Sequence, residues 1–299
     1  MVLVTHVLGV IKKYGGLNTM QILFQKVPPS YELILFGDNQ QGNTLQYTKG
    51  FQATVDYVLA ERNRCAVHMG DAVEGFWIDD PRYTPATLKE DPLTAAKEFK
   101  RIVKPMVDRN RLIALLMGNH EWSLYKKAGN ITKFICEDTS IQYGGFACVI
   151  NFIDKHGLQF KGFFEHGRKL IRSVADDPVR RVANEKLQLK QHLKNKMGDT
   201  LVMAKGHIHR LIVAEPHESL WIATEEKDIK QKYTHSRYKE HTYIHPDHRW
   251  YASTGSYLRT FAEGVESYSE LAEYDPVELG YVIVTVEDRQ VVNVRKVVI

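Results

Sequence analysis

Cysteine is scarce in this chain of 299 residues, and the cysteines that are present form no pattern. Cys65, Cys136 and Cys148 are odd in number and do not show the spacing of a metal-binding motif. A fold held by disulfide bonds is therefore disfavoured, and we expect a reducing, cytoplasmic compartment.

Long apolar runs are also missing. No segment approaches the roughly 20 apolar residues that a membrane-spanning helix needs, so we expect no membrane association. The chain begins with apolar residues and becomes basic afterwards, which is the wrong order for a secretory signal. Residues 1–24 are treated as an N-terminal extension of unclear role: a short helix, a strand, or a leader before a start at Met20.

A strong excess of one charge is likewise absent. The net charge is +4, from 40 basic and 36 acidic residues, which permits an anionic substrate without requiring one. The apolar content of 43% is ordinary for a globular protein with a sizeable core. With no internal repeat and no clear linker, residues 25–299 are predicted to form one domain.

The first half of the chain alternates buried strands with amphipathic helices. The runs "ELILFGD", "CAVHMGD" and "LIALLMGN" are typical of buried strands, and helical patterns separate them, the second interrupted at Pro105. This β-α-β-α-β order predicts parallel strands joined by helical crossovers.

The second half has a different pattern. Two strand-like runs surround the turn "DKHG", a basic helix begins near Pro178, and further strands end in a closing hairpin rich in valine. A hydrophilic insertion near 225–248 shows no clear periodicity. The chain as a whole is therefore predicted to belong to the α/β (α+β) class.

Polar side chains follow five of the predicted strands. They are Asp38 and Gln40; Asp71 and Glu74; Asn119, His120 and Glu121; His166; and His207 and His209. One such ending is usually a turn residue or a helix cap. Five in series favour one shared edge of a sheet, where ligands bind in open α/β folds. Carboxylate, amide oxygen and imidazole are ligands for divalent metals.

The segment "KGHIHR" places two histidines on either side of Ile208. On a regular strand, residues two apart point the same way, so both imidazoles would face one site. The alternative is a pair of histidines on a solvated loop.

The ordered set GD-x-x, GD-x-x-E-G, GNHE, HG and GHIH resembles the calcineurin-like metallophosphoesterases, over roughly Glu32 to Arg210. The resemblance implies a four-layer αββα sandwich of two mixed β-sheets flanked by helices. It also implies a site for two divalent metal ions. By the same resemblance Asp71 bridges both ions; Asp38, Gln40 and His209 complete one site; and Asn119, His166 and His207 complete the other.

The resemblance also implies that His120 stands beside the phosphate as the catalytic residue, with Glu121 or another acid orienting its ring. Two ions would neutralise the phosphate oxygens and activate water for attack on phosphorus. Manganese is the favoured metal, with magnesium, zinc or iron as alternatives.

One position departs from the family pattern. The family usually opens with Asp-x-His, whereas this chain has Asp38-Asn39-Gln40. A neutral amide oxygen is a weaker donor than imidazole, so we expect this site to bind its ion more weakly and to prefer manganese or magnesium over zinc. The departure leaves open a non-catalytic scaffold with a degenerate metal site.

The substrate class follows from what the motifs lack. The segments "GDAVEG" and "LMGNHEW" have no arginine of the kind found in the protein Ser/Thr phosphatases, so protein phosphatase activity is disfavoured. A phosphodiesterase acting on nucleic acid is favoured, and a DNA nuclease above all. The alternative is a phosphodiesterase or phosphatase for small molecules such as nucleotides or cyclic nucleotides.

Two basic segments support a nucleic-acid partner, although either one would also suit an ordinary solvated surface. One is the helix after Pro178, and the other is the insertion, where lysines mix with tyrosines. Arg259 is expected near the mouth of the site, where it would meet a phosphate. A homo-oligomer is compatible with the sequence.

Overall fold

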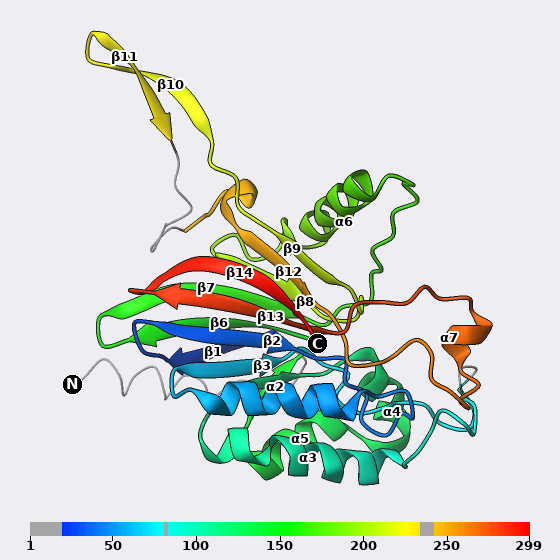
Figure 1. Cartoon of the computed structure of the whole chain (residues 1–299). Coiled ribbons are helices and arrows are strands. Elements are labelled where there is room, and N and C mark those ends of the chain that lie inside the picture. Colours follow the sequence, from blue (N-terminus) through cyan, green and yellow to red (C-terminus); the bar gives the residue numbers. More distant parts are fainter. Residues whose placement is uncertain (1–19, 81–82, 234–241) are drawn as a thin grey trace.

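The computed structural model describes residues 20–80, 83–233 and 242–299 of the chain. Two six-stranded mixed sheets pack face to face, and helices cover both outer faces (Figure 1). This arrangement confirms the predicted four-layer sandwich of the α/β class.

Sheet I contains, in spatial order, β1 (Gln21–Lys26), β6 (Ala147–Asp154), β7 (Gly157–Glu165), β8 (Val202–Lys205), β12 (Trp250–Thr254) and β9 (Leu211–Ala214). Sheet II contains β14 (Gln290–Val298), β13 (Gly280–Glu287), β2 (Tyr31–Phe36), β3 (Arg64–His68), β4 (Leu112–Leu116) and β5 (Gln142–Gly145). Strands β2 to β5 are parallel, as the alternation of strands and helices predicted.

Helices α2 (Thr48–Ala60), α3 (Pro92–Asp108), α4 (Asn119–Ala128) and α5 (Ile131–Thr139) lie on the outer side of sheet II, and α6 (Pro178–Leu193) lies on that of sheet I (Figure 1). A short helix, α7 (Tyr268–Leu271), lies in the loop between β12 and β13, and a 3₁₀ turn, η2 (Pro246–His248), precedes β12.

The two-residue period of β2 shows how the layers are held together. Leu33 and Leu35 face sheet I in the core between the sheets, whereas Ile34 and Phe36 face the helices. Burying both faces of one strand explains why its sequence is almost continuously apolar. A third cluster, which includes Leu189 of α6, packs this helix on sheet I.

Helix α3 continues through Pro105, contrary to the predicted interruption. Pro105 lies on the exposed side of the helix, where water can satisfy the carbonyl group that loses its backbone donor. The side chain of Asp91 caps the start of α3, since it accepts from the backbone N–H groups of Leu93 and Thr94.

At the N-terminus, β1 pairs in parallel with β6 and crosses the predicted boundary between residues 24 and 25. Residues 1–19 lie outside the described part of the chain, so the role of the extension stays a prediction. Within the described residues, no helix has both the length and the apolarity to cross a membrane. All three cysteines are buried and unpaired.

The first part of the hydrophilic insertion, together with the residues just before it, forms structure that the sequence did not predict. Strands β10 (Leu220–Glu225) and β11 (Asp228–Tyr233) form an antiparallel two-stranded ribbon that projects from the sandwich (Figure 1). We call Leu220–Tyr233 the ribbon. Residues 234–241, in the middle of the insertion, lie outside the described part of the chain.

Candidate metal centre

The predicted site residues all come from segments that follow strands. Asp38 and Gln40 follow β2, Asp71 follows β3, Asn119 and His120 begin α4 after β4, His166 follows β7, and His207 and His209 follow β8. These strands belong to both sheets, and their carboxyl ends meet at one edge of the sandwich. The contacts below therefore join residues that are far apart in the sequence.

The first group of contacts centres on Asp71, which is fully buried. Its Oδ2 atom lies 3.1 Å from His166 Nε2, and the same His166 nitrogen lies 3.0 Å from Asn119 Oδ1. The ligand atoms of Asp71, His166 and His207 all lie within 4.8 Å of one another. A carboxylate and two imidazoles at this spacing can share one cation.

The second group centres on Asp38, which is also fully buried. Its Oδ1 atom lies 3.3 Å from His209 Nε2 and accepts from the backbone N–H of His207 at 3.1 Å. The Gln40 N–H donates to the Asp71 carbonyl at 2.9 Å, which ties the loops after β2 and β3 together. The two predicted half-sites are thus adjacent.

Five of the predicted ligands have left-handed backbone conformations. The φ angles are 52° at Asp38, 45° at Gln40, 52° at Asp71, 71° at His207 and 59° at His209. Such values are uncommon for residues other than glycine, and they cluster where a site dictates the backbone.

These angles also correct the explanation given for the His-x-His pair. β8 ends at Lys205, so His207 and His209 lie beyond the strand and its two-residue alternation does not orient them. The left-handed turn brings both imidazoles to the site instead.

Two buried oxygen atoms in the site lack a hydrogen-bond donor among the described residues. They are Gln40 Oε1 and Asp71 Oδ2, and the latter lies 3.1 Å from His166 Nε2. A buried acceptor without a donor is costly, and a cation would satisfy both atoms. The donor set, with carboxylate, amide and imidazole groups, therefore fits divalent metal ions.

Charge within the site is balanced by its own histidines. Burial opposes the charge of Asp71, but His166 and His120 beside it hold its pKa well below the usual range. Burial likewise opposes the charge of His166, but Asp71 and Asp38 raise its pKa to about 9. Burial lowers the pKa of His207 to about 4, so this imidazole is neutral and can act as a ligand at neutral pH.

His120 is oriented by Glu74 rather than by Glu121. The Nδ1 atom of His120 lies 2.5 Å from Glu74 Oε1, and Glu74 Oε2 accepts from Asn43 Nδ2 at 2.7 Å. The Nε2 atom of His120 lies 3.2 Å from Gln40 Nε2, which can donate to it. A carboxylate on Nδ1 fixes the tautomer and leaves Nε2 directed at the site.

Glu121 has a different position, because it points back along the start of α4. Its carboxylate accepts from the backbone N–H groups of Asp71, Val73 and Gly118, at 3.2, 3.0 and 2.8 Å. Burial and the nearby Asp71 raise its pKa to about 7. Glu121 thus fixes the backbone of the loop that carries Asp71.

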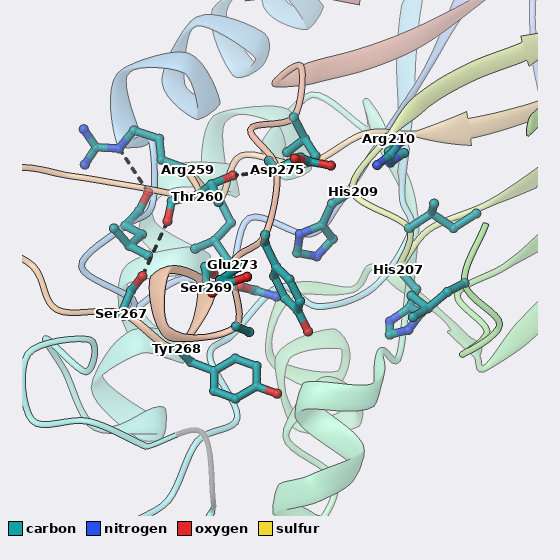
Figure 2. Close-up of a pocket in the computed structure, with 18 of the residues that line it drawn as sticks. His207, His209, Arg210, Arg259, Thr260, Ser267, Tyr268, Ser269, Glu273 and Asp275 are labelled. Carbon is teal, nitrogen blue, oxygen red and sulfur yellow. Dashed lines mark hydrogen bonds between the residues drawn. The ribbon is translucent and has the colours of Figure 1, made fainter. Parts of the chain in front are cut away.

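A cavity of about 630 Å³ opens beside these residues. Gln40, Asn119, His120, His207 and His209 line one side of it. The opposite side is formed by the loop around α7, with Tyr268, Glu273 and Asp275 (Figure 2). Sequence reasoning missed this wall, because the loop carries no recognisable motif.

Arg259 lines the cavity but is turned away from the histidines. Its Nε donates to the carbonyl of Leu45 at 3.2 Å, and Figure 2 shows the guanidinium pointing away from His207 and His209. The predicted contact between Arg259 and a phosphate therefore finds no support in this side-chain position.

No protein-family model and no curated protein matches the chain. Solved structures that match include the phosphoesterase YfcE from E. coli, at 12% identity and a TM-score of 0.39, over 88% of this chain and 98% of that one. Vps29 of Chaetomium thermophilum matches at 11% and 0.35, over 90% and 97%. The nuclease MPE from Pseudomonas putida matches at 11% and 0.30, over 89% and 87%.

The chemistry that the site can perform follows from its own geometry and from the motifs that form it. The four layers are those that the resemblance to the calcineurin-like metallophosphoesterases implied.

Proposed function

We propose that this protein is a divalent-metal-dependent phosphoesterase that hydrolyses phosphodiester bonds, with nucleic acid, and DNA in particular, as its substrate. The observation that carries the proposal is the buried Asp71 Oδ2, which has no hydrogen-bond donor among the described residues and lies beside two imidazoles. A buried carboxylate oxygen of this kind beside imidazoles is suited to bind a cation.

In this proposal, Asp71 would help to hold the divalent ions. Asp38, Gln40 and His209 would supply further ligands on one side of it, and Asn119, His166 and His207 on the other. The ions would supply Lewis-acid chemistry, neutralising phosphate oxygens and activating water. Manganese is the favoured ion because of the neutral amide at Gln40.

His120 is the proposed catalytic residue. Glu74 accepts the Nδ1–H, stabilises the charged ring and keeps Nε2 directed toward the cavity. Water attacks phosphorus while the bond from phosphorus to the leaving oxygen breaks, and His120 Nε2–H donates its proton to that oxygen. Glu121 holds the surrounding backbone in place. The Gln40 amide can donate to Nε2 only while the ring is neutral, so protonation of His120 at Nε2 releases that contact.

A small phosphodiester or monoester is a second candidate substrate, and the cavity itself favours it. Its volume of about 630 Å³ falls within the range of small-molecule pockets. Glu273 and Asp275 in its wall would repel a polyanion that continued in that direction.

The test is turnover by metal-stripped protein refilled with manganese. The substrates are a chromogenic phosphodiester, its monoester analogue and labelled single- and double-stranded DNA. Asp71→Asn should abolish turnover, and Asp108→Asn, an exposed acid on α3, serves as the matched control.

Cleavage of the diester and of DNA, lost only in Asp71→Asn, would support the nuclease. In that case the affinity for DNA should fall steeply as salt rises. Turnover of small esters alone would favour the second candidate. No turnover with any divalent metal would contradict an enzyme and favour a scaffold with a degenerate site.

A further inference from the structure

Three aromatic side chains form a contiguous exposed cluster close to the candidate metal centre. Trp122, Tyr125 and Phe146 have exposed fractions of 37, 45 and 40%. The Trp122 ring centroid lies 5.1 Å from that of Tyr125 and 5.2 Å from that of Phe146. Single exposed apolar residues are ordinary, but a group in mutual contact marks an interaction surface.

This aromatic cluster is attached to the residues of the metal centre. Trp122 lies two residues after His120, in the first turn of α4. The carbonyl of Phe146 accepts a hydrogen bond from the backbone N–H of His166 at 3.1 Å. Both ends of the cluster are therefore joined through the backbone to proposed functional residues.

Three cations without ion-pair partners among the described residues lie close in the sequence to Tyr125 and to His166, the backbone partner of Phe146. Lys126 follows Tyr125 on α4, and Arg168 and Lys169 closely follow His166. All three are exposed, and none forms an ion pair with the residues that the structure describes. Lys127, by contrast, pairs with Asp79. Exposed cations without acidic partners can bind phosphates, and flat exposed rings can stack on bases.

We propose that Trp122, Tyr125 and Phe146 are a stacking platform for the unpaired bases of a single-stranded nucleic acid, with Lys126, Arg168 and Lys169 contacting its phosphates. The inference rests on the proposed function and deepens it, because it selects single strands over duplexes. In a duplex the base faces are stacked on one another and cannot reach the rings. A partner with both negative charge and aromatic faces matches both parts of this surface.

The experiment measures binding without cleavage. Fluorescein-labelled oligothymidine and a duplex of equal length are titrated with full-length protein in EDTA. Wild-type protein should bind the single strand more tightly. Trp122→Ala should weaken that binding by about 10- to 100-fold, as expected for the loss of one stacked base. Trp122→Phe should retain most of the affinity but lose the quenching of tryptophan fluorescence that stacking causes.

Trp221→Ala is the matched control, since Trp221 is 41% exposed but lies on the ribbon. It should leave the affinity for the single strand within twofold of wild type. Tyr125→Ala gives a second test if Trp122→Ala does not fold, as judged by its thermal unfolding.

Equal binding of single strand and duplex, or unchanged binding by Trp122→Ala and Tyr125→Ala, would overturn the platform. Failure of the proposed function is separate from this outcome, because it would appear as absent turnover in manganese whatever the binding in EDTA. If the enzyme is active, cleavage of single-stranded DNA by Trp122→Ala should fall at least tenfold more than turnover of the chromogenic diester.

Discussion

The metal centre and the ribbon make opposite use of similar residues. Both are rich in ionisable side chains in the sequence, and both were expected to meet the phosphates of a nucleic acid. At the metal centre, Asp38 and Asp71 are fully buried and contact histidines. On the ribbon, Glu225 pairs with Lys230 and Lys232, at 2.9 and 3.2 Å, in solvent.

The difference lies in burial and in how many contacts fix each group. Exposed ion pairs such as those of Glu225 are screened by water and contribute little to stability. The ribbon also carries as many acids (Glu225, Glu226, Asp228) as lysines (Lys227, Lys230, Lys232), so its charges cancel. A basic stretch in the sequence therefore does not by itself form a basic surface. The comparison predicts large effects at the metal centre and small ones on the ribbon.

After Asp71→Asn, the largest effect is expected from Glu74→Gln. The amide keeps the shape of the side chain but removes the charge that stabilises a protonated His120. Turnover of the chromogenic diester should fall by about 100-fold, in line with other residues that orient a functional histidine. Steady-state kinetics over a pH range will measure the change. A loss of less than twofold would contradict the role given to this pair.

Gly118→Ala should also reduce turnover strongly. A Cβ atom at Gly118 would lie 1.9 Å from Asp71 Oδ1, so the Asp71 loop must move. A displacement of about 1 Å in such a site can cost roughly 100-fold in rate. The matched control is Gly129→Ala, where a Cβ meets nothing within 4 Å but φ is +74°. It should lower the free energy of unfolding by about 1 to 3 kcal/mol and leave kcat unchanged.

Gln40→His should strengthen zinc binding. Imidazole is a better donor for zinc than an amide oxygen, so we expect roughly a tenfold gain in affinity at the weaker of two sites. Calorimetric titration of metal-free protein with zinc and manganese will show whether the preference for manganese decreases. Two equally tight zinc sites in the wild-type protein would refute the argument.

Stability should fall in acid because of His68, which is buried beneath the metal centre. Both nitrogens of the neutral ring have a hydrogen-bond partner. Nε2 lies 2.6 Å from Asn39 Oδ1, and Nδ1 accepts from the Gly70 N–H at 3.3 Å. Burial lowers its pKa to about 3 from the ordinary 6.5. His68 therefore takes up a proton at a higher pH in the unfolded chain than in the folded protein. The free energy of unfolding falls as the pH decreases from 6.5 toward 3.

The expected loss from this group is about 1.4 kcal/mol per pH unit within that window. Urea unfolding in EDTA at several pH values, for wild type and His68→Gln, isolates the contribution of His68. The slope should be shallower in the variant. Parallel curves would show that His68 does not titrate in this way.

The smallest effect is expected on the ribbon. Trp221→Ala should change the free energy of unfolding by less than about 0.5 kcal/mol, as for surface positions in general, and should not alter diester turnover. Thermal unfolding and kinetics on the same preparation will measure both. A large loss would mean that the ribbon contacts the sandwich or supports the site, and the comparison would fail.

Much of this architecture could be predicted because the strands are strongly patterned. The runs ending at Phe36, His68 and Leu116 are short, almost continuously apolar and followed by glycine within two residues, and their polar endings share one edge. The side chains of Asp38, Asp71 and His166 converge for this reason.

Other features depend on contacts that a sequence does not display. Glu121 is adjacent to His120 in the sequence, yet the carboxylate that contacts the His120 ring is that of Glu74. The first turn of α4 directs Glu121 back to the backbone N–H groups of Gly118 and Asp71. The aromatic cluster could not be predicted from the sequence, because Phe146 contacts Trp122 only in the folded chain.

The left-handed residues at the metal centre have a consequence for the evolution of this chain. Each left-handed residue that is not glycine costs roughly 1 kcal/mol, so five of them cost about 5 kcal/mol, as much as the whole net stability of a small domain. Replacing them with glycine would relax the backbone and remove the ligands together. Selection for stability alone would therefore remove these ligands, so stability and metal binding oppose each other at these five positions.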